Sequence, residues 1–488
     1  MNRSVRKQIH ENFEVQDDRN GQRIRLLRQE RNVLDSESCY LDMGGNNYSI
    51  INYSSFGVAI TCGADFKCDN EIYDVPFVYN RVEITQLHIR QIRRESQADN
   101  TDVIAFEIIG EPINQDKIEA VNNAQRLIQL QQDYVQTTQS VPMEIKAQVY
   151  QIADWLEHLM AQVLDIEDNI KHTNHQSIQD YEETIVSMVA NYIANVFPAI
   201  FGEFGDLSKD LPDETRKDSV HFLRQKLNHL IYQAPFADRV FNKPLGYAGD
   251  FEMMNLIYKQ ENIGKSLFAR CLQRYYINEP AAVAVRNRAD YLIGVILNEL
   301  KSSNTKKPFR MLSVACGPAM EWQRLLPELG ELDKQVNVDL LDQDKQALLS
   351  TQNRLRYLQS KHPSSVNFQF INKAIKNIIV RGTECDEYDL IYSAGLFDYL
   401  SDPVAFTAAK QLFNSLRPGG KLIIGNFNVG NPNQVVMDYA LDWELIYRSE
   451  EELLSLFKNI GGDLTVESES LDINLFCVIK KQLRQRKI

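Results

Sequence analysis

Cysteine and histidine are scarce in this chain of 488 residues, and long apolar runs are missing. The cysteines are scattered and form no CxxC pair; they are Cys39, Cys62, Cys68, Cys271, Cys316, Cys385 and Cys477. We therefore expect neither a disulfide framework nor a zinc site, and this usage fits a reducing cytoplasm. No apolar run is long enough to predict a membrane span, and the polar start of the chain predicts no secretion signal.

Positive charge is also in deficit, because 53 Lys and Arg residues face 66 Asp and Glu residues, for a formal charge of -13. This balance argues against a broad phosphate-backbone binder, so no nucleic-acid partner is expected. The hydrophobic share of 44% and the charged share of 24% are typical of a globular protein. At roughly 150 residues per domain, the length predicts about three domains. We expect a cytoplasmic, multidomain protein.

The residues up to about 120 and the residues from 121 to 300 differ in their pattern of apolar and turn residues. Up to about residue 120, short β-rich runs alternate with turn residues and predict an antiparallel all-β module. Residues 121–300 predict helices, which form a connector. After Pro142, apolar residues recur at alternating intervals of four and three, at Ile145, Val149, Ile152, Leu156, Leu159 and Val163. We interpret this seam as an ordinary core-facing helix, with a homodimer contact as the alternative. A second helical pattern follows and is expected to end at Pro198.

Residues 301–488 alternate strand-like and helix-like segments, which predicts a doubly wound, parallel α/β sheet. Ligands of such sheets bind beyond the carboxyl ends of the strands. The first βα turn, residues 315–319, is rich in small residues but matches neither GxGxxG nor a Walker loop, which disfavours a pyrophosphate ligand. The second strand is expected to end at Asp342, an acid suited to ribose hydroxyls, with Asp344 as the cap of the next helix.

The series ACGPA, VDLLDQDKQAL, YDLIYSAGLFDYL and LRPGGKLIIGNF resembles the class I S-adenosylmethionine-dependent methyltransferases, which have a Rossmann-like fold. The resemblance implies that Ala315, Cys316 and Gly317 surround the methionine moiety and that Asp342 binds the ribose. It further implies adenine contacts after the third strand and methyl-donor contacts after the fourth. The residues at these positions are Asn372, Lys373 and Ala374 after the third strand, and Ser393, Ala394 and Gly395 at the end of the fourth. Gln343, which follows Asp342, is a further candidate for binding the cofactor. Cys316 and Pro318 depart from the usual GxGxG pattern.

Upstream, RVFNKPLGYAGDFEMMNLIY and EPAAVAVRNRADYLIGVI resemble the cap of a methyltransferase subgroup that includes 3-hydroxypalmitate methyl ester synthases of bacterial quorum sensing. On this resemblance Tyr247 and Asp250 close over the cofactor or substrate. Arg286 and Arg288 are candidates for pairing the methionyl or the substrate carboxylate, because a guanidinium grips a carboxylate with two hydrogen bonds. The alternative for Arg288 is a solvated helix face.

Histidine is nearly absent from the predicted catalytic domain, where His362 stands alone beside Pro363. A hydroxyl acceptor usually needs a base, whereas a carboxylate is already ionised at neutral pH. The sequence therefore favours O-methylation of a small, lipid-like carboxylate such as a 3-hydroxy fatty acid. Asp250 or Tyr399 as a base is the alternative, with Tyr247 as a further catalytic candidate. The missing NPPY-like motif also disfavours a nucleic-acid substrate.

Within residues 20–118, the NxSxxG sequence at 52–57 and the runs HIRQIRRE and DVIAFEII resemble a PilZ domain, a six-stranded β-barrel family that binds cyclic di-GMP. The resemblance implies that Asn52, Ser54 and Gly57 contact the nucleotide, together with Arg28 and Arg31. Arg19 and Arg23 fit the family's RxxxR spacing but lie far upstream, and Arg28 and Arg31 are one residue too close together. The alternative is a PilZ-like barrel without a nucleotide.

The main hypothesis is thus a methyltransferase regulated by cyclic di-GMP through the connector. A second hypothesis is a signalling adaptor, in which the barrel binds the second messenger and the methyltransferase fold is catalytically idle. A third is methylation of a protein side chain, which would give labelled protein rather than an organic-extractable product. The intact turn at 315–319 and Asp342 favour cofactor binding and rank the adaptor second.

Overall fold

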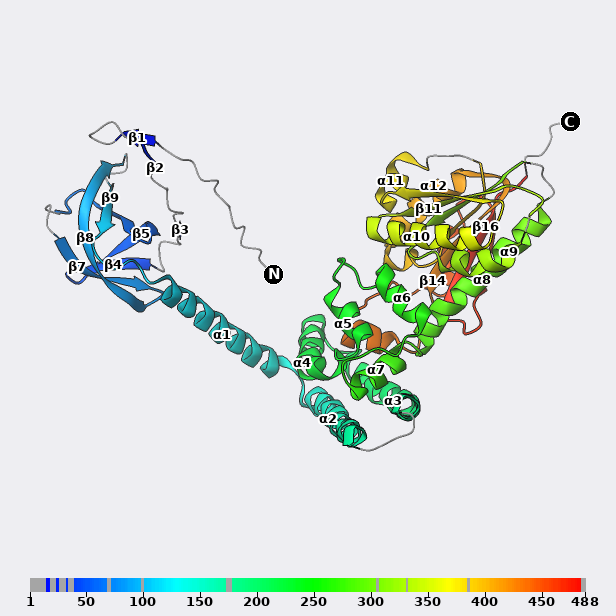
Figure 1. Ribbon diagram of the computed structural model, residues 1–488, viewed down its shortest axis with the longest axis horizontal. Helices are drawn as coiled ribbons and strands as arrows, with labels where there is room; N and C mark the ends of the chain where they lie inside the picture. The colour runs from blue at the N-terminus through cyan, green and yellow to red at the C-terminus, as the bar shows by residue number, and fades with distance from the viewer. Residues whose placement is uncertain are drawn as a thin grey trace. The chain divides into compact units, whose positions relative to one another are not determined.

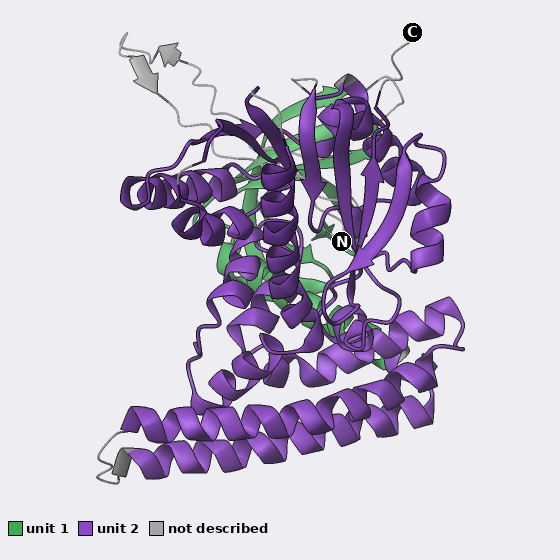
Figure 2. Ribbon diagram, turned by 90° about the vertical axis from the view of Figure 1, so that its right-hand side faces the viewer, with its two compact units in different colours: residues 1–136 green, residues 137–488 purple. Residues whose placement is uncertain are grey.

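The chain divides into two compact units, residues 1–136 and residues 137–488 (Figure 2). The first contains the antiparallel strands, and the second contains most of the helices and a large mixed sheet. The computed structural model describes residues 15–17, 23–25, 32–33, 39–67, 72–97, 101–172, 178–303, 307–330, 332–383 and 387–483.

Antiparallel strands of the first unit close into a barrel. They pair in the order β5-β4-β7-β8-β9-β6, and β6 pairs again with β5. Their bounds are β4 (Cys39–Met43), β5 (Asn46–Ser54), β6 (Gly57–Gly63), β7 (Ile72–Tyr79), β8 (Val82–Ser96) and β9 (Thr101–Ile108). Three short strands accompany them, β1 (Val15–Asp17), β2 (Arg23–Arg25) and β3 (Asn32–Val33), the last paired with β5. The predicted antiparallel barrel is confirmed.

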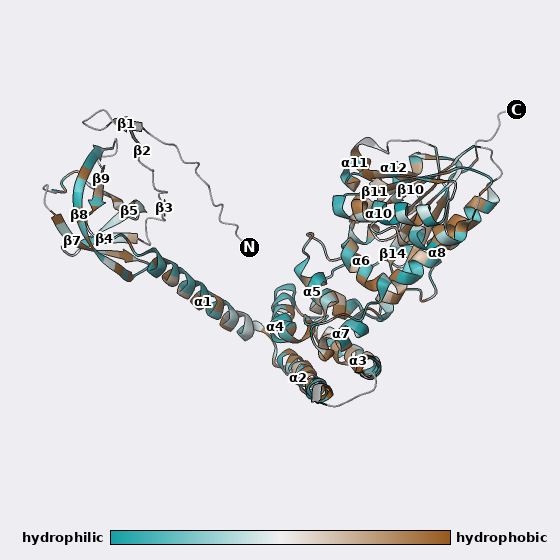
Figure 3. Cartoon of the chain, in the orientation of Figure 1, coloured by the Kyte–Doolittle hydropathy of each residue, from teal (hydrophilic) through white to brown (hydrophobic). Residues whose placement is uncertain are grey.

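Helix α1 (Gln115–Ser140) begins against the barrel. Ile113, just before the helix, and Ile118, in its first turn, are buried in the barrel core. The Tyr79 hydroxyl donates to Asn122 Oδ1 at 2.8 Å, which fixes the next turns of the helix. Beyond these contacts α1 is largely hydrophilic (Figure 3), with Leu127 63% exposed. The barrel therefore specifies the direction in which α1 leaves it.

Helices fill the first half of the second unit. They are α2 (Met143–His172), α3 (Ile178–Ser208), α4 (Asp213–Ile231), α5 (Pro235–Asn242), α6 (Phe251–Lys259), α7 (Leu267–Tyr276) and α8 (Pro280–Ser302). The predicted seam of α2 is buried along its whole length, from Ile145 to Val163. It packs on α3 and α4, and α2 and α3 run side by side in Figure 2. The expectation of a core-facing helix is confirmed.

The prediction that the second long helix ends at Pro198 is wrong, because α3 continues to Ser208 with Pro198 inside it. A proline inside a helix removes one hydrogen bond and crowds the preceding turn. Burial of Phe197, Phe201 and Phe204 on one face offsets that cost. By length and composition α3 is also apolar enough to cross a membrane, which we did not expect from the sequence. Its buried aromatic face is what a helix of a protein core requires.

The second half of the unit is a sheet in the order β12-β11-β10-β13-β14-β16-β15. The strands are β10 (Phe309–Val314), β11 (Val336–Asp342), β12 (Val366–Asn372), β13 (Tyr388–Ser393), β14 (Leu416–Phe427), β15 (Asp463–Ser468) and β16 (Asn474–Lys480). The first five are parallel, and β16 inserts antiparallel between β14 and β15. The order reverses between β10 and β13. This is the predicted doubly wound sheet with its final antiparallel pair.

Helices cover both faces of this sheet (Figure 1). One face packs on α11 (Ile375–Arg381), α12 (Asp402–Asn414) and α13 (Glu450–Phe457). The other face packs on α8, α9 (Met320–Leu329) and α10 (Lys345–Lys361). Alternation along β10 explains the division, because Leu312 and Val314 join the first core and Phe309 and Met311 join the second. The carboxyl ends of β10 and β13 are thereby left adjacent at the switch point, where α/β sheets bind ligands.

Candidate functional site

The turn after β10 has an unusual backbone conformation. Ala315, Gly317 and Ala319 have φ values of 54°, 50° and 46°, in the left-handed region that non-glycine residues rarely adopt. Such strain persists where surrounding structure holds it, and it is frequent at binding sites. A Cβ on Gly317 would meet nothing within 4 Å, so the backbone of this turn borders open space. Burial raises the pKa of the Cys316 thiol well above its ordinary value, so the side chain stays neutral.

Asp342 holds the turn in place from the end of β11. Its Oδ2 accepts from the Gly317 amide at 2.8 Å, and its Oδ1 accepts from the Asp344 amide at 2.8 Å. Each carboxylate oxygen keeps a further lone pair for a ligand hydroxyl. Burial raises the pKa of Asp342, although these backbone donors oppose the shift. Asp344 caps α10, as expected, by accepting from the amide of Gln346 at 2.7 Å.

Of the residues expected after the third and fourth strands, some line a cavity and others support its wall from behind. Lys373, Ala394 and Gly395 line a common cavity with the turn and Asp342. Ser393 does not line it, because its buried hydroxyl donates to the Val314 carbonyl at 3.0 Å and so ties β13 to β10. Asn372 likewise donates to the Asp342 carbonyl, and Ala374 is the residue before α11.

Of the two cap residues, Tyr247 and Asp250, only Tyr247 lines the cavity. Burial raises the pKa of the Tyr247 phenol above the ordinary value. Asp250 is fully buried outside the lining, where it caps α6 through the Met253 amide and pairs with Arg239 at 2.8 Å. The structure therefore places Asp250 behind the wall, as a support for the loop that carries Tyr247.

The two candidate arginines lie on different faces of α8. Arg286 is outside the cavity, where its guanidinium donates to the Ile277 carbonyl at 2.5 Å. Arg288 is inside the cavity wall and only 7% exposed. Among the described residues it forms no ion pair, and its Nε has no hydrogen-bond partner, but its Nη2 donates to Met254 Sδ at 3.2 Å and its charge opposes the raised pKa of Asp398 and of Glu321. Its guanidinium lies against Gly395, so close that a Cβ there would be 2.7 Å from Nη1.

These residues surround one cavity of about 280 Å³ beyond the carboxyl ends of β10 and β13. Much of the wall is apolar and comes from the cap, α8 and the segment after β14. Members not named so far include Phe251, Met254, Tyr258, Val285, Met320, Ile375, Phe427 and Leu445. No histidine of the described chain lines it, in keeping with the absence noted in the sequence. An apolar pocket with a few polar groups is typical of small-molecule sites.

The sequence did not reveal two acids in the wall, Asp398 and Glu321. Burial raises the pKa of Asp398 to about 6, although the Phe427 amide and nearby arginines oppose the shift. Burial likewise raises the pKa of Glu321, which accepts from the Tyr392 hydroxyl at 2.8 Å. Asp398 directly precedes Tyr399 in the motif SAGLFDY, so that motif carried a signal for it.

Tyr399 lines the cavity as expected; 40% of the residue's surface is accessible, but its hydroxyl lies against Gly249 and Trp443. Its hydroxyl accepts from Trp443 Nε1 at 2.8 Å. Burial raises the pKa of the phenol above its ordinary value, so Tyr399 is a hydrogen-bonding group rather than a ready base at neutral pH. Trp443 had no sequence signal, because it reaches the cavity only through the irregular chain after β14.

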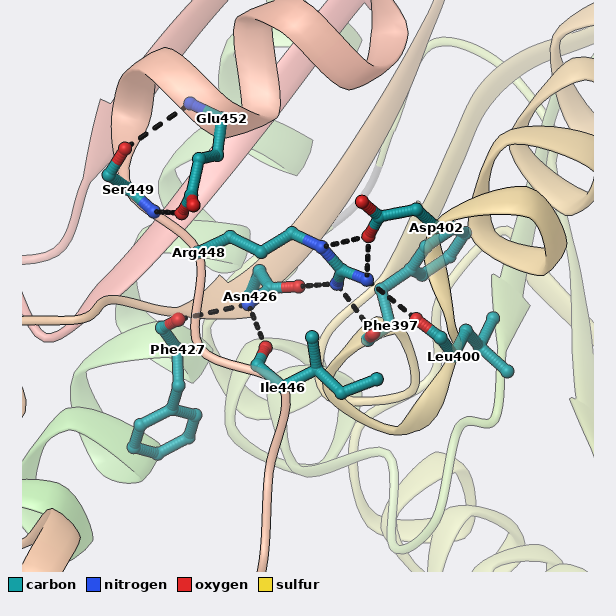
Figure 4. A network of polar contacts seen from close by, with 9 residues as sticks. All are labelled: Phe397, Leu400, Asp402, Asn426, Phe427, Ile446, Arg448, Ser449 and Glu452. Atoms are coloured by element: carbon teal, nitrogen blue, oxygen red, sulfur yellow. Dashed lines mark hydrogen bonds and ion pairs between the residues drawn. The ribbon is translucent and has the colours of Figure 1, made fainter. Parts of the chain in front are cut away.

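A buried arginine fixes the segments that carry these residues (Figure 4). Arg448 donates to the carbonyls of Phe397 and Leu400, at 3.0 and 2.6 Å, and pairs with Asp402 at 2.8 Å. It also donates to the Asn426 side chain at 2.6 Å, which joins β14 to the same network. The loop of Asp398 and Tyr399 is thus held at both ends by one guanidinium.

In the barrel, Asn52 and Ser54 lie on β5 and Gly57 begins β6. Tyr53 between them is buried, so strand alternation places Asn52 and Ser54 on the outer side. Ser54 and Gly57 pair across the two-residue turn of a hairpin. Arg28 and Arg31 lie outside the described residues, as does Arg19, and the side chain of Arg23 is not described either.

No family model matches the chain, and no curated protein matches its sequence. Solved structures do match, with low similarity. A possible exported protein from Bordetella parapertussis is 16% identical, with 61% of this chain and 97% of that chain covered and a TM-score of 0.39. The magnesium protoporphyrin IX methyltransferase ChlM from Synechocystis PCC 6803, with bound SAH, is 11% identical (54% and 99% covered, TM-score 0.35). The N-methyltransferase NodS from Bradyrhizobium japonicum WM9, in complex with S-adenosyl-L-homocysteine, is 16% identical (42% and 89% covered, TM-score 0.29).

The chain thus has a distant structural similarity to S-adenosylmethionine-dependent methyltransferases. The class of fold is defined by this chain's own strand order and by its antiparallel final strands.

Proposed function

We propose that the chain is an S-adenosylmethionine-dependent methyltransferase that O-methylates a small, lipid-like carboxylate such as a 3-hydroxy fatty acid. The observation that carries the proposal is a buried guanidinium, Arg288, in the wall of an otherwise largely apolar cavity that also contains Asp342. The charges of Asp398 and Glu321 act on this guanidinium, but neither carboxylate forms an ion pair with it, so the guanidinium can still bind a ligand carboxylate through two hydrogen bonds.

The described residues fit the cofactor. Asp342 offers carboxylate lone pairs for two ribose hydroxyls, and the turn at 315–319 brings backbone close to open space. Lys373 and Ile375 border the cavity beyond β12, where an adenine ring would lie. The bound cofactor would supply an electrophilic methyl group on a sulfonium, whose S–C bond breaks as an acceptor O–C bond forms.

The remaining task of the protein is to bind and orient the acceptor. Arg288 holds an incoming carboxylate in its ionised form, so no base has to remove a proton from it. Its guanidinium lies against Gly395, beyond β13, so a carboxylate bound to it would lie at the switch point of the sheet. Tyr399 and Tyr247 remain protonated at neutral pH and are available as hydrogen-bond donors. The apolar walls exclude water and receive the aliphatic part of the acceptor.

The first test separates the cofactor's own carboxylate from that of an acceptor. Calorimetry would compare wild type and Arg288→Met with S-adenosylhomocysteine, with 5′-methylthioadenosine, which lacks the amino-acid part, and with octanoate. If Arg288 binds the acceptor, the variant should no longer bind octanoate but should still bind S-adenosylhomocysteine and 5′-methylthioadenosine. If it binds the methionyl carboxylate, S-adenosylhomocysteine weakens while 5′-methylthioadenosine does not. Mass spectrometry for methyl esters after incubation with S-adenosylmethionine completes the test, and absence of any methylated product would refute the enzyme assignment.

We further propose that cyclic di-GMP bound at Asn52 and Ser54 regulates this activity through α1. The turn between β5 and β6 is linked to the chain that leads into α1, because the Ser55 carbonyl accepts from the Ile113 amide at 3.1 Å. The Phe56 carbonyl accepts from the Ile108 amide at 2.9 Å. A ligand on this turn therefore touches the segment that starts the helix, and a difference in its affinity for two states of that segment would be needed for regulation.

Calorimetry with cyclic di-GMP, on wild type and Asn52→Ala, tests the barrel separately. Binding that Asn52→Ala weakens, together with a changed affinity for S-adenosylhomocysteine, would support regulation, because coupling between sites is reciprocal. Binding of cyclic di-GMP without any binding of S-adenosylhomocysteine would favour the adaptor. A cytoplasmic location and a homodimer through the helical connector belong to the same proposal, and sedimentation at several concentrations tests the second.

A further inference from the structure

A second, smaller cavity lies behind the main one. Its volume is about 30 Å³, and its walls are mostly apolar, although Glu279 and Asn433, which are hydrogen-bonded to each other, also line it. We call it the inner chamber; its lining includes Phe236, Ile257, Ala281, Ala282, Met437 and Leu441. Trp443 lines both the inner chamber and the main cavity, so the two cavities meet at this residue.

The walls of the two cavities are continuous on either side of this indole. On α8, Ala281 lines the inner chamber, whereas Val285 and Arg288 line the main cavity. Spacings of four and three residues place these side chains on one helix face. In the chain after β14, Leu441 lines the inner chamber and Leu445 the main cavity, with Trp443 between them.

Trp443 is a core residue, 5% exposed, and its ring lies beside that of Phe236 with the ring centroids 6.4 Å apart. Its indole N–H donates to the Tyr399 hydroxyl at 2.8 Å, and its backbone amide donates to the Met437 carbonyl at 2.8 Å. The preceding residue, Asp442, has a φ of 54°, and the π-helical segment η2 (Val436–Ala440) lies just upstream. Rare backbone conformations of these kinds are often found where a segment has a functional role.

The segment itself is fixed from outside, so a movement of the indole does not require it to detach. Arg224 pairs with Asp442 at 2.8 Å and donates to the Tyr439 carbonyl at 2.7 Å, and Lys243 also pairs with Asp442. These contacts hold the chain just before Trp443, and none of them involves the indole ring.

We infer that Trp443 is a gate and that the inner chamber is a subsite for the aliphatic tail of the acceptor. This inference rests on the proposed function, because it takes the carboxylate to be held at Arg288. The main cavity, at about 280 Å³, has to contain the reacting parts of two molecules and leaves little room for a tail. Rotation of the indole joins the inner chamber to it.

The geometry gives the tail a length. Ala281 and Arg288 are seven residues apart on α8, or about 10 Å along the helix axis. An extended chain of about nine atoms spans this distance, since three residues of extended backbone cover roughly 10 Å. A carboxylate of octanoate size would therefore reach the inner chamber, whereas butyrate would stay in the main cavity.

Calorimetry with butyrate, octanoate and dodecanoate, in the presence of saturating S-adenosylhomocysteine, tests the inference. Octanoate should bind more tightly than butyrate by about fourfold for each additional methylene that is buried. Ala281→Leu fills the inner chamber and should weaken octanoate at least about tenfold while leaving butyrate unchanged. Trp443→Ala joins the cavities and should raise the affinity for dodecanoate. Trp155→Ala, an indole removed from the α2–α3 contact, is the matched control and should preserve the wild-type chain-length profile.

Thermal melting and S-adenosylhomocysteine binding would show that each variant is folded, and Ala281→Val replaces Ala281→Leu if the larger side chain prevents folding. Equal losses for butyrate and octanoate, or unchanged profiles in both Ala281 and Trp443 variants, would overturn the tail subsite. Detection of methyl esters separates the two proposals. If methyl esters form but the Ala281 and Trp443 variants keep the wild-type dependence of affinity on chain length, the proposed function is supported and the gate is refuted. If carboxylate binding depends on chain length but no methyl ester forms, the tail subsite is supported and the methyltransferase activity is refuted. No carboxylate binding at all overturns both.

Discussion

Replacement of Asp342 by alanine should abolish most of the affinity for S-adenosylhomocysteine. Both carboxylate oxygens are already fixed by backbone amides, those of Gly317 and Asp344, so the group is pre-organised for further hydrogen bonds. A hydrogen bond to a charged group contributes about 1.5–3 kcal/mol. Loss of two such bonds to the ribose would cost about 3 kcal/mol or more, which is over a hundredfold in Kd.

The matched control for this experiment is Asp339→Ala. Asp339 is on the same strand, three residues earlier, and it is 5% exposed, but it accepts from the Tyr388 hydroxyl and does not line the cavity. Its loss should lower thermal stability without changing calorimetric affinity for S-adenosylhomocysteine. If Asp342→Ala binds within about threefold of wild type, or if Asp339→Ala weakens binding equally, the assignment of the ribose site is refuted.

The pH dependence of the same affinity has a defined sign. Burial raises the pKa of Asp342 above its ordinary value of 3.8, and the ionised form is the one that accepts two hydroxyls. As the pH is lowered, affinity should therefore be lost at a higher pH than an exposed aspartate would give. Asp342→Asn should remove this acid limb of the binding profile. A profile that is flat down to pH 4 in wild type would contradict the reasoning.

Three further predictions concern stability and the acceptor. Burial raises the pKa of Glu279 from 4.5 to about 7, so its stabilising contribution is complete below about pH 4.5 and is lost as the pH rises through 7, by about 3 kcal/mol in total. Urea unfolding at pH 5 and pH 8 should therefore show a loss of stability that is smaller in Glu279→Gln than in wild type by about this amount, the remainder coming from other buried acids such as Asp398. Arg448→Met leaves a buried set of acceptors unpaired and should destabilise the protein by about 3 kcal/mol or more, whereas an unchanged melting temperature would refute the bracing role of this guanidinium. Gly395→Ala displaces the Arg288 guanidinium and should weaken octanoate about tenfold, with 5′-methylthioadenosine as the unaffected comparison ligand in calorimetry.

Much of the fold was predictable because its signals are local. The strands from β10 to β16 follow from apolar runs bounded by turn residues, and the Asp344 cap follows from its position before an amphipathic segment. The end of α3 was not predictable from Pro198, since the burial of three phenylalanines beyond it is decided by packing. Local rules give an element's type better than they give its limits when tertiary contacts compete with them.

Site residues at the ends of strands were predictable from the sequence, whereas site residues carried by loops were not. Asp342 and Gly317 follow from the strand ends, and the family resemblance added Gly395 after the fourth strand. Arg286 and Arg288 were equivalent in sequence, but residues two apart on a helix face different directions, and only Arg288 borders the cavity. Trp443 and Asp398 depend on loops whose course is set by distant ion pairs such as that of Arg448 with Asp402.

The order of synthesis gives one of these features a consequence for folding. The core of the helices α2 to α8 is completed by Phe427, Trp443 and Ile473, which are made long after the helices themselves. Until those residues leave the ribosome, the nascent helices lack part of their apolar partner surface. The helical layer and the sheet of residues 137–488 are therefore expected to mature together at the end of translation, and a chain truncated before residue 427 should be captured by chaperones rather than accumulate as a folded fragment.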